Sequence, residues 1–296
     1  MAGVVSTSSS ARPRLNAGAL REALVVPGGF WRDIRVVGET GSTNSDLLAE
    51  ARRGLGEGVV LAAESQSAGR GRMGRVWVSP PRAALMFSAL LRPADVPPAS
   101  RGWVPLLAGV AVARALRAEA AVDAWLKWPN DVQVHGAKLA GILAEQAGDA
   151  IVVGTGINVS AGRGDLPAEA TSLALQGART DRDRLLASVL RELERWYLAW
   201  AGQRGDADRC GLRPEYQRLC GTLGRTVRVS LPGGSTVTGM ATEVDAAGRL
   251  VVRSASGLVP VSAGDVVHVR PAPKGAVPPG LRTEGACDRA TREGGA

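Results

Sequence analysis

Short apolar runs separated by glycine and polar residues dominate the first part of the chain. Their spacing predicts buried strands over 34–37, 59–63, 85–91, 124–132, 138–145 and 151–159. Apolar stripes at helical spacing predict core helices over 101–121 and 181–200, and a shorter helix after Ser42–Asn44. The pattern therefore predicts a large domain that contains both strands and helices.

The pattern changes at both ends of this region. Residues 201–221 read as a polar helical connector, and beyond them short strands separated by Gly-rich turns predict a small five-stranded barrel at 226–229, 236–241, 250–252, 258–261 and 266–269. Ser, Ala and Gly enrichment predicts a flexible segment over 1–28, in which Leu15–Val26 has the pattern of one helix. We therefore expect domains at 29–221 and 222–271, then a disordered tail over 272–296.

Composition narrows the class of protein. The chain has 296 residues, 45% of them hydrophobic, which is enough for one large and one small domain. A net charge of +8 favours an anionic partner. Three cysteines and two histidines without metal-ligand spacing argue against a disulfide framework or a zinc site. Neither a signal peptide nor a membrane span is evident, so we expect a soluble, cytoplasmic protein.

Glycine and arginine alternate in the loop between the strands 59–63 and 85–91. Arg70, Arg72 and Arg75 are interleaved with glycines, so the backbone is able to pass close to a ligand while guanidinium groups point inward. This arrangement is typical of a loop that closes over phosphate. The alternatives are a solvated basic loop, or an arginine-glycine segment that grips RNA nonspecifically.

Lysine is rare in this chain, and its positions carry information. Of 36 basic residues only Lys127, Lys138 and Lys274 are lysine, and the first two lie close together. A position that has lysine, although the chain otherwise uses arginine, indicates a need for a compact point charge rather than a planar guanidinium group. Lys127 also lies in an apolar strand that ends in Pro129-Asn130-Asp131, where it needs an anionic partner.

Glycines within two predicted strands indicate a groove on one face of the sheet. Gly141 interrupts the strand 138–145, and Gly154 and Gly156 interrupt the next. A glycine inside a strand often marks the close approach of a ligand. Ser42–Asn44 lies at the junction between a predicted strand and a predicted helix. Its hydroxyl and amide side chains cap the helix, or its hydroxyls and backbone N–H groups bind a polar ligand, and both interpretations stay open.

Four motifs, taken together, resemble those of the biotin–protein ligases in their short form without an N-terminal DNA-binding domain. They are Gly69-Arg70-Gly71-Arg72-Met73-Gly74-Arg75-Val76-Trp77, Lys127-Trp128-Pro129-Asn130-Asp131, Lys138-Leu139-Ala140-Gly141-Ile142-Leu143 and Gly154-Thr155-Gly156-Ile157-Asn158. The resemblance covers roughly residues 35–270. It implies an α+β fold, with a mixed sheet flanked by helices in a class II synthetase-like core, followed by an SH3-like barrel.

The resemblance also implies a two-step reaction: biotin and ATP give biotinyl-5′-AMP, which a lysine of a biotin carboxyl carrier domain then attacks. Lys138 should contact the biotin carboxylate and the α-phosphate, Arg70 should help close the loop, and Asp131 should accept or orient the proton of the acceptor amine. The implied biotin contacts are Ser42, Thr43, Asn44, Gln66, Arg70, Gly71, Arg72, Lys138, Gly141, Ile142, Gly154 and Gly156. The implied ATP or adenylate contacts are Arg70, Arg72, Arg75, Trp77, Lys127, Asn130, Lys138, Ile157 and Asn158.

The family pattern further implies Mg²⁺ bound with ATP, without an assigned protein ligand, and an acidic carrier domain of an acyl-CoA carboxylase as acceptor. We expect a monomer or weak homodimer, no sequence-specific DNA binding and no membrane association. Met73 stands where many members have another arginine, and the loop Ala168–Leu173, where relatives cover adenine, lacks an aromatic. A lipoate or octanoate ligase or transferase, and a basic RNA-binding module, are the alternatives.

Overall fold

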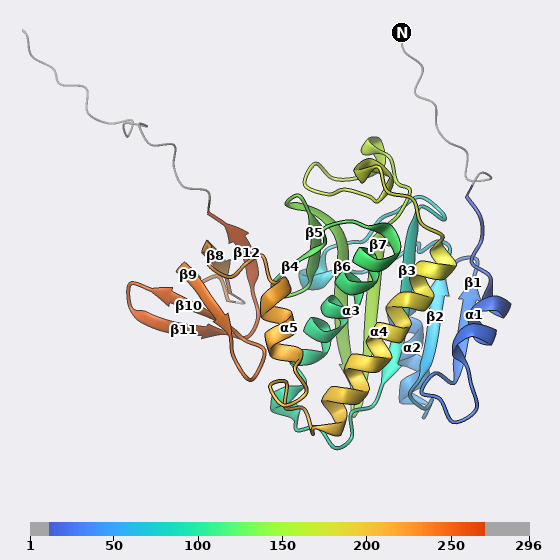
Figure 1. Cartoon of the computed structure of the whole chain (residues 1–296), viewed down its shortest axis with the longest axis horizontal. Helices are drawn as coiled ribbons and strands as arrows, with labels where there is room; N and C mark the ends of the chain where they lie inside the picture. Colours follow the sequence, from blue (N-terminus) through green and yellow to red (C-terminus); the bar gives the residue numbers. More distant parts are fainter. Residues whose placement is uncertain (1–11, 232, 270–296) are drawn as a thin grey trace, which may run out of the picture.

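The structure is a computed structural model that describes residues 12–231 and 233–269 (Figure 1). Its helices are α1 (Ala17–Leu24), α2 (Thr43–Arg52), α3 (Trp103–Ala120), α4 (Arg182–Gly202) and α5 (Leu212–Leu219), with short 3-10 turns at Arg72–Gly74, Pro98–Ser100, Arg163–Asp165 and Ala174–Gln176. The strands of the large sheet are β1 (Asp33–Val37), β2 (Val59–Ala63), β3 (Ala84–Leu91), β4 (Trp125–Lys127), β5 (Asp131–Val134), β6 (Ala137–Ala147) and β7 (Ala150–Asn158). Each predicted strand and helix of the large domain is present, and the 124–132 strand is split at Pro129.

The seven strands form one mixed sheet in the order β1-β2-β3-β7-β6-β5-β4. β1 and β2 are parallel, and the remaining neighbours are antiparallel. The sheet with its flanking helices confirms the predicted fold class. It also brings the two glycine-containing strands, β6 and β7, side by side in the middle of the sheet.

Helices cover the two faces of this sheet unequally. Along β3, Leu85 and Phe87 join the main core with α3 and α4, whereas Leu90 packs with Leu47 of α2 on the other face, as expected for side chains that alternate between faces. α2 packs against β2, β3, β6 and β7. The same face toward β4 and β5 is where the cavity described below lies.

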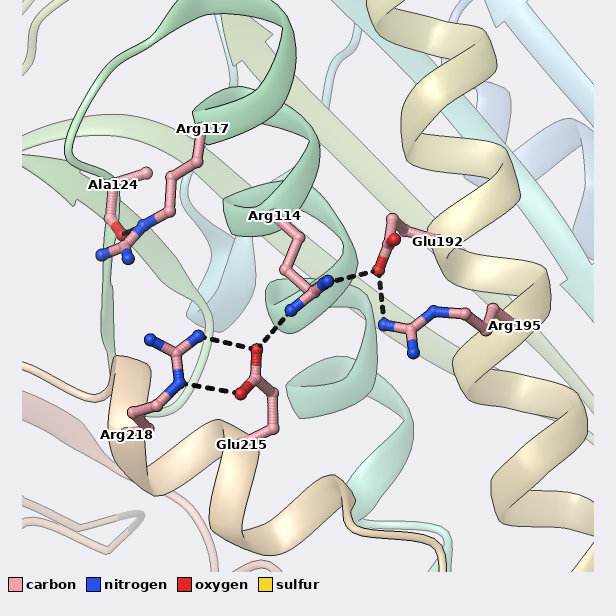
Figure 2. Close-up of polar contacts among 7 residues, drawn as sticks. All are labelled: Arg114, Arg117, Ala124, Glu192, Arg195, Glu215 and Arg218. Carbon is pink, nitrogen blue, oxygen red and sulfur yellow. Dashed lines mark hydrogen bonds and ion pairs between the residues drawn. The ribbon is translucent and has the colours of Figure 1, made fainter.

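A chain of ion pairs, here called the helix-layer network, joins α3, α4 and α5 (Figure 2). Its members are Arg114, Glu192, Arg195, Glu215 and Arg218. Arg114 on α3 lies 2.9 Å from Glu192 on α4 and 2.8 Å from Glu215 on α5. Arg218 donates two hydrogen bonds to Glu215, each 2.9 Å long. The network therefore fixes α5, whose end leads directly into the second domain.

The second domain is an antiparallel sheet of β8 (Thr226–Ser230), β9 (Thr236–Val244), β10 (Leu250–Ser254), β11 (Gly257–Val261) and β12 (Asp265–His268). Its order is β11-β10-β9-β8-β12, and among the described residues β11 and β12 do not pair with each other. The five predicted strands are present, which confirms the predicted small β domain, and within the described residues its antiparallel sheet is open between β11 and β12. Trp128 Nε1 donates to the carbonyl of Gly248 at 3.1 Å, which ties this sheet to the large domain.

The prediction of a flexible N-terminal segment is wrong for residues 12–28, although the helix predicted within Leu15–Val26 is present as α1. Leu15, Leu20 and Leu24 are buried in the main core, so residues 12–28 pack as part of the large domain. A buried ion pair between Glu64 and Arg182, 2.8 Å long, holds this segment, because Glu64 Oε1 also accepts the backbone N–H of Leu15 at 2.6 Å. The three leucines bury enough apolar area to hold this segment against the core, although the residues between them are mostly small or polar.

Residues 1–11 and the predicted tail 272–296, which includes Lys274, lie outside the described residues. Within 12–231 and 233–269, no helix has both the length and the apolar character that crossing a bilayer requires.

Candidate functional site

One line of paired residues crosses the open part of the large sheet. Lys127 pairs with Asp131, Asp131 with Gly141, and Gly141 with Gly156 across β4, β5, β6 and β7. Residues that are directly paired project from the same face of a sheet. Asp131 and Lys127 therefore stand beside a floor made of two glycines, and the predicted glycine groove is confirmed.

The groove is part of a cavity of about 1640 Å³ between the large sheet, the Gly-Arg loop and the second domain. The predicted site residues that line it are Ser42, Thr43, Asn44, Gln66, Arg70, Gly71, Arg72, Arg75, Trp77, Lys127, Asn130, Asp131, Lys138, Gly141, Ile142, Gly154, Gly156 and Asn158. Ile157 is different: its side chain is fully buried in the main core, on the other face of β7. The side chain of Ile157 therefore does not line the cavity, and the predicted nucleotide contact stays a prediction for its backbone.

The start of α2 places polar side chains at one end of the groove. Ser42 Oγ accepts the backbone N–H of Ser45 at 3.5 Å, so the capping role is present. The backbone N–H and the hydroxyl of Thr43 both donate to Gln66 Oε1, at 2.8 and 3.2 Å. Asn44 donates to the carbonyl of Leu143 at 3.1 Å. These contacts hold donors and acceptors in fixed positions before any ligand binds.

The Gly-Arg loop is folded over the cavity, and each arginine is held by a different element. Arg70 lies 3.0 Å from Glu145 on β6, and Arg75 pairs with Asp265 on β12. Arg72 donates to Asn130 Oδ1 at 2.9 Å. Burial lowers the pKa of Arg72 below its usual value, although the nearby charge of Asp131 opposes the effect. A partly buried cation whose hydrogen-bond partner is a neutral amide favours the arrival of an anion.

Trp77 occupies the groove. A Cβ added to Gly156 would lie 2.5 Å from the Trp77 ring, and one added to Gly141 would lie 3.2 Å from it. The indole Nε1 is buried and has no hydrogen-bond partner among the described residues. Lys138 Nζ lies 6.0 Å from the centre of the same ring. The two glycines are therefore required for the close approach of the Trp77 ring, and a ligand in the groove would contact this ring or displace it.

Lys138 lies where the groove meets the loop predicted to cover adenine. Its Nζ is 2.7 Å from Asp131 Oδ1, and both side chains are largely buried. The backbone N–H of Lys138 donates to the carbonyl of Glu169 at 2.9 Å, and its carbonyl accepts the N–H of Thr171 at 2.8 Å. Asn158 donates to the carbonyl of Thr171 at 2.9 Å. The loop therefore borders the cavity beside Lys138, as predicted.

Comparison with known proteins agrees with this geometry. Residues 40–161 match the biotin/lipoate A/B protein ligase family, and residues 222–269 match the biotin protein ligase C terminal domain. The chain is similar to the biotin--[acetyl-CoA-carboxylase] ligase of Mycobacterium tuberculosis, with 45% identity over 264 residues that make up 88% of this chain and 97% of that protein. The chain belongs to the biotin protein ligase family.

Other members of the family are similar over most of their length. The bifunctional ligase/repressor BirA of Escherichia coli is 34% identical, over 79% of this chain and 73% of that protein. Among solved structures, the biotin protein ligase from Aquifex aeolicus in complex with biotin and ATP has a TM-score of 0.68 and 28% identity, and it covers 81% of this chain and 100% of that one. The two matched regions therefore lie one in each domain of the chain.

Several residues at the site were not predicted from the sequence. Glu145 and Asp265 hold two of the loop arginines, and Arg225 lines the cavity from the second domain. Asp265 lies 190 positions from its partner Arg75, and no local pattern reports such a contact. The run of glycines and valines around Arg225 identifies a strand, but it does not show which cavity the strand borders.

Proposed function

We propose that the protein activates biotin with ATP as biotinyl-5′-AMP and transfers the biotinyl group to a lysine of a biotin carboxyl carrier domain. The observation that carries the proposal is the convergence of Lys138, Asp131 and the loop arginines on a groove floored by Gly141 and Gly156. Biotin ligases of similar sequence supply the substrate class, and a similar structure in complex with biotin and ATP supports both substrates.

In the first half-reaction a carboxylate oxygen of biotin attacks the α-phosphorus of ATP. A phosphorus–oxygen bond forms to biotin, the bond to the bridging oxygen breaks, and pyrophosphate leaves. Two anions must meet, so fixed cations aimed at the α-phosphate are the main source of rate. Lys138, beside Asp131, and Arg72, beside Asn130, supply that field. Lys138 must exchange Asp131 for the substrate anions when they bind.

In the second half-reaction the acceptor amine attacks the acyl carbon, the bond to the AMP oxygen breaks, and AMP leaves. The attacking ammonium must lose a proton. The exchange at Lys138 frees the carboxylate of Asp131, which lies on the groove face and is placed to accept that proton. Closure of the Gly-Arg loop excludes water from the mixed anhydride between the two steps.

The remaining features of the activity follow the same chemistry. Among the described residues, no three His, Cys, Asp or Glu side chains gather in a metal-binding group. Mg²⁺ bound by the phosphates of ATP, as the resemblance implies, would neutralise phosphate charge. The net charge of +8 fits an acidic carrier domain as acceptor. We further propose a cytoplasmic monomer or weak homodimer that does not bind DNA sequence-specifically.

A lipoate or octanoate ligase or transferase is the second candidate, because the match over residues 40–161 covers both classes. The match of residues 222–269 to the biotin protein ligase C terminal domain favours biotin. Exchange of labelled pyrophosphate into ATP, with no acceptor present, separates the candidates. We expect exchange with biotin and none with lipoate or octanoate.

Lys138→Ala should abolish this exchange because the central cation of the groove is lost, while the variant still folds and unfolds cooperatively in urea. The control is Arg228→Ala, which removes an exposed charge outside the cavity and should exchange normally. Normal exchange by Lys138→Ala would remove Lys138 from the mechanism. Exchange supported by octanoate instead of biotin would replace the proposed substrate.

A further inference from the structure

Two cations that line the cavity stand apart from the others. Arg70, Arg75 and Lys138 are each paired with a carboxylate. Lys127 on β4 and Arg225 at the start of the second domain also line the cavity, and across the described parts of the chain neither side chain has an ion pair or hydrogen bond. Two unpaired cations facing one cavity are an incomplete electrostatic arrangement that an anion would complete.

The backbone fixes these two cations relative to each other. The residues on either side of Lys127 are bonded to the interdomain connection: the carbonyl of Leu126 accepts the N–H of Gly221 at 2.8 Å, and the N–H of Trp128 donates to Thr222 Oγ1 at 3.1 Å. The N–H of Arg225 in turn donates to the carbonyl of Thr222 at 3.3 Å. A short and hydrogen-bonded path therefore joins Lys127 to Arg225, although they belong to different domains.

His268 lies against the same connection and is influenced by both charges. Its Nε2 is 3.2 Å from Thr222 Oγ1. Burial, and after it the charges of Lys127 and Arg225, lowers the pKa of His268 to about 4. The imidazole is therefore neutral at physiological pH and does not supply a counter-charge. The charges of Lys127 and Arg225 both lower the pKa of His268, which agrees with the position of both side chains at the same end of the cavity.

The position of this pair along the groove indicates what it binds. Lys127 is the outermost residue of the line Lys127, Asp131, Gly141 and Gly156, at the β4 edge of the large sheet. Lys138 lies farther inward, 2.7 Å from Asp131, where the reacting α-phosphate is placed by the proposed function. A nucleotide held there has room for its terminal phosphates toward the β4 edge, where the second domain begins.

We propose that Arg225, together with Lys127, binds the terminal phosphates of ATP and the pyrophosphate that leaves, so that the second domain supplies part of the nucleotide site. This inference rests on the proposed function for the identity of the reaction. It assigns to Arg225 a ligand contact that requires both domains to be in place, and it gives the interdomain hydrogen bonds a role in the first half-reaction.

The test compares ligands that differ only in the phosphates. Pyrophosphate, ATP and AMP, each with Mg²⁺, are titrated calorimetrically into the full chain with and without biotin. Arg225→Ala should weaken pyrophosphate and ATP about tenfold, the size expected for one charge-assisted contact, and should leave AMP unchanged. Arg225→Lys keeps the charge and should stay within about threefold of wild type. Arg228→Ala, three residues along and outside the cavity, should change none of the three.

Several outcomes would overturn the inference. The first is that Arg225→Ala binds pyrophosphate and ATP as tightly as the wild type does. The second is that Arg225→Ala loses affinity for AMP to the same extent as for ATP. The third is that the wild-type chain shows no saturable binding of pyrophosphate. The proposed function fails separately, when wild-type protein shows no biotin-dependent exchange of pyrophosphate into ATP. Pyrophosphate binding that depends on Arg225 would then still stand.

Discussion

Glu215 is the centre of the helix-layer network, and replacing it by glutamine should destabilise the fold without changing its shape. The carboxylate accepts two hydrogen bonds from Arg218 and one from Arg114, and its side chain is 14% exposed (Figure 2). Glutamine keeps the volume and removes the charge. The variant therefore tests the electrostatic part of the link between α3 and α5.

The magnitude follows from the ionisation of the carboxyl. Hydrogen bonds from Arg218, and also those from Arg114, hold the pKa of Glu215 at about 2, against a usual value of 4.5 and against the opposing effect of burial. At about 1.4 kcal/mol per pKa unit, this shift sets an upper limit of about 3 kcal/mol. The Arg218 and Arg114 side chains are 56% and 39% exposed, so solvent screens the interaction. We expect a loss of about 1–2 kcal/mol at neutral pH.

Urea unfolding of Glu215→Gln and wild type at a series of pH values measures this loss. The folded-state pKa is depressed, so the stabilisation is fully present above the unfolded pKa near 4.5 and is lost as pH falls toward 2. The difference between the two proteins should be constant from pH 7 to about 5 and should shrink below that. Glu22→Gln, at an exposed position of α1 that makes no ion pair within the described residues, is the control. Equal stability of the two variants, or a difference that grows in acid, would refute the reasoning.

Two further variants test the groove and the N-terminal packing. Gly156→Ala places a methyl group 2.5 Å from the Trp77 ring and should destabilise the fold by about 1–3 kcal/mol. Because the same methyl group fills the floor of the groove, the KM for biotin should also rise. Gly38→Ala, which has open space around it, should change neither quantity, and equal KM values for the two variants would contradict the groove. Glu64→Gln breaks a buried ion pair with Arg182 and should cost about 3 kcal/mol in urea unfolding, so a loss no larger than that of Glu22→Gln would show that the pair does not hold residues 12–28.

The elements of this protein follow from its local sequence. Apolar runs and helical stripes identified the strands of both sheets and the helices α2, α3 and α4, because burial of one face imposes a period that the sequence must show. The interior glycines and the Gly-Arg alternation likewise indicated a groove and a closing loop. Gly141 and Gly156 prove to be direct neighbours across β6 and β7, although their pairing register is not a local property.

Contacts between distant segments were decided only by the tertiary structure. The seating of Trp77 against Gly156, and the carboxylates that hold Arg70 and Arg75, each join residues far apart in the chain whose local patterns do not refer to one another. The open form of the second sheet and the buried N-terminal segment depend in the same way on which surfaces meet.

The sequence by itself therefore determined the strands, the groove-forming glycines and the types of charge at the site. The tertiary structure decided which charges neutralise each other and which remain available, as at Lys127 and Arg225. The physical reason is range: backbone preference and burial period act over a few residues, whereas an ion pair depends on a distance of a few ångströms that the whole fold sets.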